Sequence, residues 1–251
     1  QILRRRRYEQ GLVEAVFPVV VSDLPAMVQI ELQLVPVGAH RALVGDKILV
    51  AVTPLDGGAI GPDLGGDGAA LVAELEVVRY LVAERKRSAI EVVKGWEGPL
   101  RAPQDFSFPD QLIEVKSWGG AVGAKVRISS EIQLQVVDRP IYLAAVHLVE
   151  DSESTNGRSL NDIVKTTRSI LPPEVIDLFE DRLNAARYIE LPYYDAPRFR
   201  IDATDFFEVA GEFPALVPDR LPPATTDVQY TLDLAQLSAF RISEIPEPAD
   251  G

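Results

Sequence analysis

The sequence contains no cysteine, which excludes disulfide bonds, thiolate metal sites and a cysteine nucleophile. It has only two histidines, His40 and His147, so a zinc site built from several histidines is not expected. His147 lies in the apolar run 141–148, where a hydrogen-bonded core or strand-end histidine is a more common role than a triad base. The absence of cysteine is consistent with a cytoplasmic protein, which is the location we expect.

Long apolar runs are also missing. No stretch approaches the roughly 18 to 20 apolar residues that a membrane-spanning helix needs. Residues 1–7 lack the apolar segment of a signal peptide, so no export signal is expected there. Hydrophobic residues nevertheless make up 47% of the 251 residues, enough for the core of one large domain or two small ones.

Positive charge is scarce, and the net charge of −13 argues at first against a nucleic-acid partner. The distribution changes this view. Residues 79–139 contain ten Lys and Arg against eight Asp and Glu, a balance of +2 that leaves −15 for the remainder of the chain. The middle of the chain is therefore a long stretch that does not repel phosphate, and a bound divalent cation would make it more positive.

The hydrophobic pattern predicts an α/β core with a mixed sheet flanked by helices. Helices are expected over residues 69–87, 130–137, 156–171 and 173–187. Strands are expected at 105–108, 112–118 and 125–128, which would form a meander, and at 141–148, 198–201 and 228–232. The continuous apolar strand at 141–148 is expected to be central.

Around this core the sequence predicts further parts. Residues 1–68 form a β-rich N-terminal region that ends in a glycine-rich loop without a phosphate-binding pattern. Residues 69–150 form the core, residues 151–244 a helical and β extension packed on it, and residues 245–251 a tail.

The segment 112–118 carries the chemistry. Side chains alternate between the two faces of a strand, so Glu114 and Lys116 project to one side, about 7 Å apart along the strand. Ile113 and Val115 project to the other side and can fill the core. Asp105 opens the preceding strand, and a tight turn at 109–111 would bring it close to Glu114.

Two neighbouring carboxylates repel each other unless a cation lies between them, and Mg²⁺ prefers oxygen ligands. Lys116 can orient or activate the attacking water and offset charge in the transition state of phosphodiester hydrolysis. The alternative is a surface ion pair on an amphipathic strand, and the spacing alone does not decide between the two interpretations.

The resemblance to a known family is more specific than the spacing. It is carried by Trp96-Glu97-Gly98-Pro99, by the segments 104–108 and 113–117, by 127–134, and by shorter matches at 140–143, 159–160, 212–214 and 228–232. These segments resemble the PD-(D/E)XK motif proteins encoded in bacterial restriction and phage-defence operons. The resemblance covers residues 70–240 and implies a restriction-endonuclease-like fold.

By matching position, the resemblance implies that Asp105 and Glu114 are metal ligands, with Val115 in the same ligand set, and that Lys116 is the catalytic lysine. It also implies a nuclease that uses Mg²⁺ or Mn²⁺.

Two further residues are candidates. Where the family has Gly-Glu-Leu on its first helix, this chain has Ala73-Glu74-Leu75, so Glu74 is a catalytic and metal-binding candidate. It lies on an apolar helix face and needs a partner, which could be the metal site or a salt bridge to an arginine. Gln133 matches a glutamine of the family and is a catalytic candidate, but Ser130-x-x-Gln133 also fits a helix capping box.

The expected function is therefore a Mg²⁺-dependent DNA endonuclease of a restriction or anti-phage system. The alternative is a nuclease-fold subunit for recognition or assembly without cleavage of its own. Expected partners are DNA, a second copy of the chain, and other products of a defence operon such as a methyltransferase or a helicase-like ATPase.

Overall fold

A computed structural model describes residues 68–119, 123–151 and 156–247, together with two short strands, β1 (Ala15–Val16) and β2 (Glu31–Leu32), which pair with each other. The chain divides into two units, residues 1–63 and 64–251, and all the elements other than β1 and β2 belong to the second unit. The glycine-rich loop and most of the expected N-terminal strands lie outside the described residues.

A curled mixed sheet forms the centre of this second unit, with strand order β10-β8-β6-β4-β3. The bounds are β3 Phe106–Ser107, β4 Leu112–Trp118, β6 Ile141–Glu150, β7 Arg158–Ser159, β8 Arg198–Glu208 and β10 Arg241–Ile242. β6 is the middle strand, parallel to β4 and antiparallel to β8, and its first six residues are buried. The α/β prediction with a mixed sheet is confirmed.

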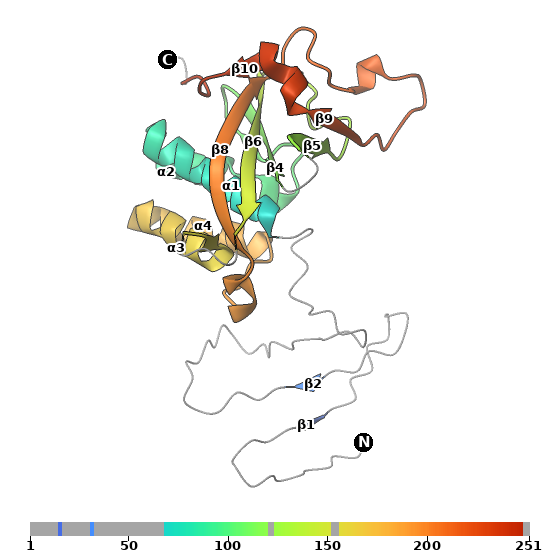
Figure 1. Ribbon diagram of the computed structural model, residues 1–251. Coiled ribbons are helices and arrows are strands. Elements are labelled where there is room, and N and C mark those ends of the chain that lie inside the picture. The colour runs from blue at the N-terminus through green and yellow to red at the C-terminus, as the bar shows by residue number, and fades with distance from the viewer. Residues whose placement is uncertain (1–14, 17–30, 33–67, 120–122, 152–155, 248–251) are drawn as a thin grey trace. The chain divides into compact units, whose positions relative to one another are not determined.

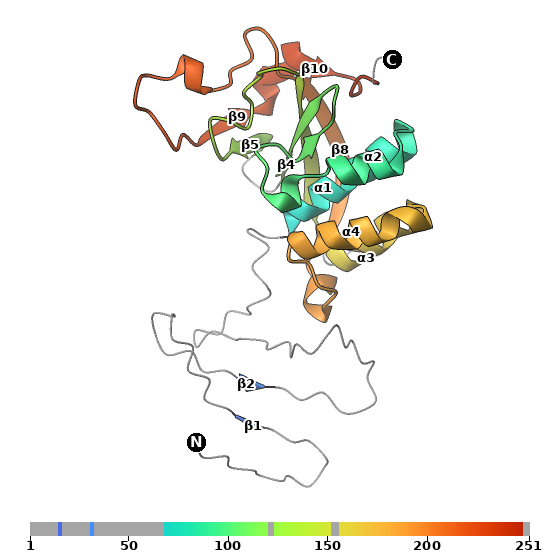
Figure 2. The same cartoon turned by 180° about the vertical axis from the view of Figure 1, so that it is seen from behind.

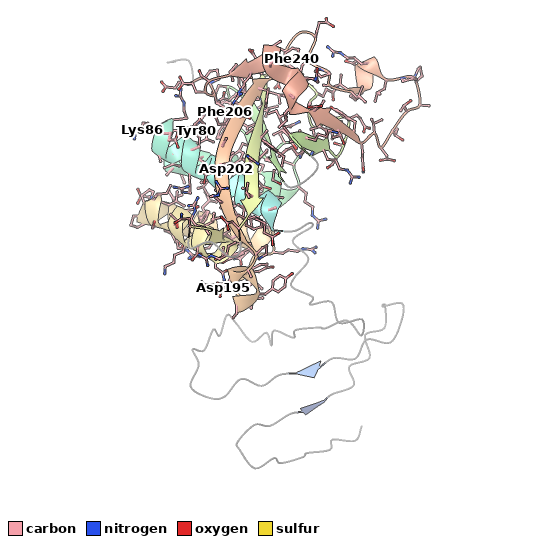
Figure 3. The ribbon with its side chains drawn as sticks, viewed as in Figure 1. Tyr80, Lys86, Asp195, Asp202, Phe206 and Phe240 are labelled. Atoms are coloured by element: carbon pink, nitrogen blue, oxygen red, sulfur yellow. The ribbon has the colours of Figure 1, made fainter. Side chains whose placement is uncertain are left out.

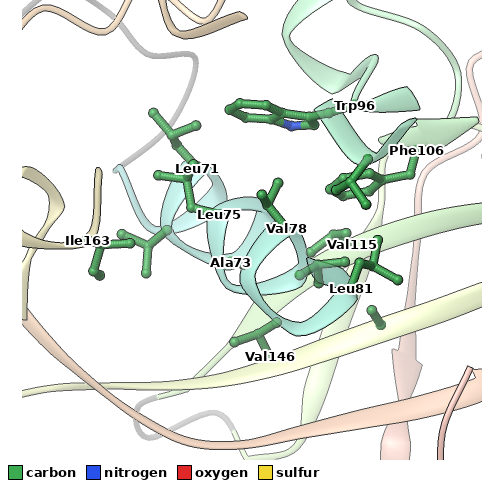
Figure 4. Packing of buried hydrophobic residues seen from close by; sticks show 14 of the residues in the cluster. Leu71, Ala73, Leu75, Val78, Leu81, Trp96, Phe106, Val115, Val146 and Ile163 are labelled. Atoms are coloured by element: carbon green, nitrogen blue, oxygen red, sulfur yellow. The ribbon is translucent and has the colours of Figure 1, made fainter. Parts of the chain in front are cut away.

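Helices cover one face of the sheet (Figures 1 and 2). They are α1 Ala69–Arg79, continued by the π-helix η1 Tyr80–Glu84, then α2 Ala89–Gly95, α3 Leu160–Ile170 and α4 Pro173–Ala185. α1 packs on β4 and β6 and against α3, and α2 packs against α4. In the close view of this core, Val115 and Val146 of the sheet lie against α1, with Trp96 and Phe106 on one side and Ile163 on the other (Figure 4).

The opposite face carries a second apolar cluster, covered by a separate two-stranded sheet of β5 (Lys125–Ile128) and β9 (Tyr230–Asp233). Short helical turns complete the chain: η2 Gly98–Leu100, η4 Pro192–Asp195, η5 Pro218–Arg220 and η6 Leu234–Phe240. β4 contributes to both clusters, with Ile113 and Val115 on the side of the helices and Leu112 on the side of the β5–β9 pair.

Two expectations about the segment after β4 were wrong. β5 does not continue a meander, because β4 pairs with β6 and β5 pairs with β9 instead. Residues 130–137 form turns and not a helix, with backbone bonds from Gln133 to Ser130 and from Gln135 to Ile132. Val136 and Val137 remain 50% and 78% exposed, so no apolar helix face is buried here to stabilise a helix.

Tyr80, which follows α1, contacts both the sheet and the C-terminal part of the described residues. The ring of Tyr80 lies 4.6 Å from that of Phe206 in β8 (Figure 3), and the Tyr80 hydroxyl accepts a hydrogen bond from the amide of Ile245 at 3.2 Å. Ile245 is 1% exposed and packs into the core, whereas Pro246 and Glu247 after it are exposed. Within the described residues, every helix falls short of the length and apolar character needed to cross a membrane.

Candidate active site

The hairpin from β3 to β4 brings Asp105 beside Glu114. The turn at residues 109–111 closes with a hydrogen bond from the amide of Phe108 to the carbonyl of Gln111, and Phe106 pairs with Ile113. Asp105 and Glu114 are therefore the next residues outward on the two antiparallel strands, as the sequence predicted.

Asp105 uses its side chain to cap the edge of β4. β3 pairs with β4 at Leu112 and Ile113, and beyond this point the amide of Val115 donates to Asp105 Oδ2 at 2.7 Å. The side chain of Val115 packs into the core at 5% exposure, so only its backbone carbonyl is left to contact a metal ion.

Glu114 and Lys116 lie on the same face of β4, and their side chains form an ion pair. Glu114 is completely buried, whereas the side chain of Lys116 is 17% exposed. The pair uses Oε1 of Glu114, and Oε2 is buried without a hydrogen-bond partner. A buried carboxylate oxygen without a hydrogen-bond partner lowers the stability of the fold if the ion pair is only structural. The same oxygen is available to bind a ligand such as a metal ion.

Glu74 reaches the same place from α1. On the predicted apolar helix face of Glu74, Val77, Val78 and Leu81 are buried but Ala70 is exposed, and the Glu74 side chain keeps partial exposure. Its Oε2 accepts a hydrogen bond from the indole Nε1 of Trp96 at 2.6 Å. The expected alternative, a salt bridge to an arginine, is absent for Glu74 in the described part of the chain.

Gly98 lies where Glu74 and Asp105 meet. A Cβ atom at this position would be 2.8 Å from Glu74 Oε2 and 2.8 Å from Asp105 Oδ1, closer than such contacts occur. The two carboxylate oxygens are therefore separated by at most twice 2.8 Å. Any side chain at position 98 would push the two acids apart.

The electrostatics of the acids follow from this crowding. Burial raises the pKa of Glu74 to about 8, and the negative charge of Asp105 adds to the rise. Burial also raises the pKa of Asp105, and it raises the pKa of Glu114 well above its ordinary range, with the charge of Asp105 again adding to the effect. All three carboxyl groups therefore resist full ionisation in the protein alone.

Lys116 balances part of this charge. Burial acts to lower the pKa of Lys116, but the negative charges of Glu114, Asp105 and Glu74 outweigh burial, and the net shift is upward. Lys116 is thus a cation at neutral pH and not a free-base proton acceptor.

The donor atoms at this site fit a hard divalent cation. Full ionisation of the three carboxyl groups beside the Lys116 ammonium would leave two negative charges unbalanced, which is the charge that one divalent cation neutralises. Within residues 68–119, 123–151 and 156–247, no three acidic or histidine side chains are placed as a ready-made metal cluster. Mg²⁺ does not require one, because it is commonly held by one or two carboxylates and keeps several waters.

Gln133 is not brought into contact with these four charged residues. Its side-chain oxygen accepts a hydrogen bond from the amide of Ser129 at 2.7 Å within its own loop. This contact resembles the helix-capping role that the sequence also allowed, although no helix follows. The loop is still held near the site, because Gln104 Nε2 donates to the carbonyls of Ile132 and Gln133 at 3.0 and 3.2 Å. A catalytic role for Gln133 remains a prediction.

Sequence reasoning missed the part played by the segment 96–98. Trp96 is a buried core residue, and its indole also contacts Glu74. The amides of Glu97 and Gly98 both donate to the carbonyl of Asp105, at 2.8 and 2.9 Å. The signal available in the sequence was the Trp96-Glu97-Gly98-Pro99 motif itself, whose glycine and buried tryptophan are explained by these contacts.

Comparison with known proteins finds a matching family. A family model described as “Putative PD-(D/E)XK family member, (DUF4420)” matches residues 68–235, which is more than half of the chain. The matched region contains all the charged residues of the site. No curated protein and no solved structure matches the chain.

Proposed function

We propose that this chain, which belongs to that PD-(D/E)XK family, is a Mg²⁺- or Mn²⁺-dependent deoxyribonuclease that hydrolyses phosphodiester bonds. The observation that carries the proposal is the buried Glu114, which combines an ion pair to Lys116 with a second oxygen that has no hydrogen-bond partner, and whose carboxyl group is affected by the charge of Asp105. A site for structural stability alone gains nothing from three crowded acids of raised pKa.

Each residue has a part in this proposal. Asp105, Glu114 and the carbonyl of Val115 would hold the metal ion, with Glu74 beside them. A bound divalent ion would polarise the phosphate and lower the pKa of a bound water. Lys116 keeps its proton, so it would orient the attacking water and stabilise the negative charge that develops on the phosphate oxygens.

We further propose a restriction or anti-phage role in the bacterial cytoplasm, with DNA as substrate and with a homodimer or defence-operon proteins as partners. The resemblance of residues 70–240 supports this role. The alternative is a recognition or assembly subunit that does not cleave. The net charge of −13 favours that alternative, since affinity for DNA would then come from a partner.

The test is cleavage of plasmid and linear DNA with Mg²⁺ or Mn²⁺, with and without the operon partners. Lys116→Ala should lower the cleavage rate at least ~100-fold, because it removes a charge that acts on the transition state. DNA affinity should change little, since one charge among several contacts is lost. The fold should persist because Glu114, whose pKa is already raised by burial, can take up a proton when its cation is removed.

Lys94→Ala is the matched control, because Lys94 is an exposed lysine in the last turn of α2. Circular dichroism checks that both variants fold. Calorimetry should also show weaker binding of Mn²⁺ to Asp105→Ala and Glu114→Ala. Cleavage by Lys116→Ala at the wild-type rate would refute its role, and a wild-type protein that binds the partners but never cuts would favour the assembly subunit.

A further inference from the structure

Trp96 is not one of the charged residues of the site, but it contacts one of them, Glu74. Its side chain is completely buried, the ring of Phe179 in α4 lies 5.9 Å away, and its backbone forms a bridge to Phe106 next to Asp105. The indole N–H is a donor with no acceptor capacity. A ring fixed on several sides therefore presents one hydrogen-bond donor to Glu74 Oε2, 2.6 Å away.

The segment 96–98 also contacts the second acid, Asp105. The amides of Glu97 and Gly98 bind the carbonyl of Asp105, while the indole of Trp96 binds the side chain of Glu74. Glu74 lies on α1 and Asp105 lies just before β3, so no local geometry sets their separation. Residues 96–98 together contact both, through the side chain of Glu74 and the backbone carbonyl of Asp105.

The hydrogen bond also favours the form of Glu74 that a cation needs. A hydrogen bond from an N–H group is stronger to an ionised carboxylate than to a neutral acceptor, so the donor both locates the Glu74 carboxylate and stabilises its ionised state.

We propose that Trp96 is a positioning residue of the site, whose indole N–H holds Glu74 beside Asp105 so that both acids serve one divalent cation. This inference rests on the proposed function. The competing explanation is a core tryptophan whose N–H needs a partner only because it is buried. The two explanations predict different results for a variant that loses the N–H and keeps an aromatic ring.

Trp96→Phe makes that change. We expect it to weaken Mn²⁺ binding about 10-fold, as is common when a residue that orients a ligand is lost. It should also lower kcat for DNA cleavage while KM changes little. Phe179→Leu is the packing control, because it disturbs the packing of the same ring but keeps the indole N–H; it should lower Tm and reduce metal affinity and kcat less than Trp96→Phe does.

A double-mutant cycle tests whether Trp96 acts through Glu74. In the Glu74→Gln background, Trp96→Phe should have no further effect on Mn²⁺ affinity, because the carboxylate it positions is gone. The two indole N–H signals in an NMR spectrum give a direct readout, since the chain has only Trp96 and Trp118. Glu74→Gln and added Mg²⁺ should move the Trp96 signal, and Glu74→Gln should leave the Trp118 signal in place.

The outcomes are distinguishable. If wild type and Trp96→Phe bind Mn²⁺ equally and cleave equally, or if the two substitutions act additively, the positioning role of Trp96 is overturned while the nuclease function stands. If Phe179→Leu lowers kcat as much as Trp96→Phe does, the effect is one of packing and the proposal also fails. A wild-type protein that neither binds Mn²⁺ nor cleaves DNA overturns the proposed function, and this inference with it.

Discussion

Without divalent metal, the free energy of unfolding should fall as the pH rises from about 5 to about 8. The pKa of Glu74 is raised to about 8, and burial raises the pKa of Asp105 and Glu114 as well. In the unfolded chain these groups ionise at their ordinary values. The folded protein therefore binds more protons over this range, and by linkage its stability decreases as the pH increases.

The magnitude follows from the shift of Glu74. Each pH unit over which this group is protonated only in the folded state reduces stability by about 1.4 kcal/mol. Two units, from about pH 5 to about pH 7, therefore give a ceiling of about 3 kcal/mol for one group. Partial exposure of Glu74 to water reduces the effect, and we expect a loss of about 1–2 kcal/mol.

The assay is urea unfolding at a series of pH values in the presence of a chelator. Glu74→Gln keeps the shape and the hydrogen bond from Trp96 but cannot ionise, so its stability should depend less on pH than that of wild type. Glu91→Gln, at an exposed position in the first turn of α2, is the matched control and should retain the wild-type slope. Mg²⁺ or Mn²⁺ should restore stability most at the higher pH values, because it binds the folded, ionised site.

A flat stability profile in the chelated protein would show that the acids are not crowded as described. The same slope in wild type and Glu74→Gln would show that Glu74 is not the group responsible.

Two further predictions concern the residues that shape the site. Gly98→Ala places a Cβ 2.8 Å from oxygens of both Glu74 and Asp105. It should therefore destabilise the fold by about 1–3 kcal/mol, measured by thermal melting, and weaken metal binding, measured by calorimetry. Unchanged metal affinity would contradict this prediction. Arg87, whose side chain is 7% exposed, pairs with Asp110 in the β3–β4 turn, so Arg87→Ala should cost about 2–3 kcal/mol of stability in urea unfolding, and an unaltered unfolding midpoint would count against this.

The local features of the site could be predicted from sequence. The bounds of β4 agree with the predicted strand at residues 112–118, and strand alternation placed Glu114 and Lys116 on one face. The turn at 109–111 and the expected nearness of Asp105 to Glu114 are also found. These features depend on residues that are neighbours along the chain, which is the range over which periodicity and turn residues are informative.

Features that depend on distant partners could not be predicted. β5 has a strand pattern, but nothing in that pattern indicates that it pairs with β9 about a hundred residues later. Residues 130–137 have the spacing of a short helix, yet their loop is held instead by Gln104 and by the side chain of Gln133. Trp96 looks the same in sequence whether its N–H binds a backbone carbonyl or a site carboxylate, because Glu74 lies on another element.

The position of β9 has a consequence for the order in which the site is completed during synthesis. The three acids and Lys116 are translated before residue 120. Glu114, however, lies on the face of β4 that the β5–β9 pair covers, and its negative charge contributes to the raised pKa of Tyr230 in β9. A nascent chain that has not yet exposed β9 from the ribosome leaves this face in contact with water. Until residue 233 has emerged, Glu114 cannot reach its buried state, so the geometry of the site forms only after β9 has been synthesised.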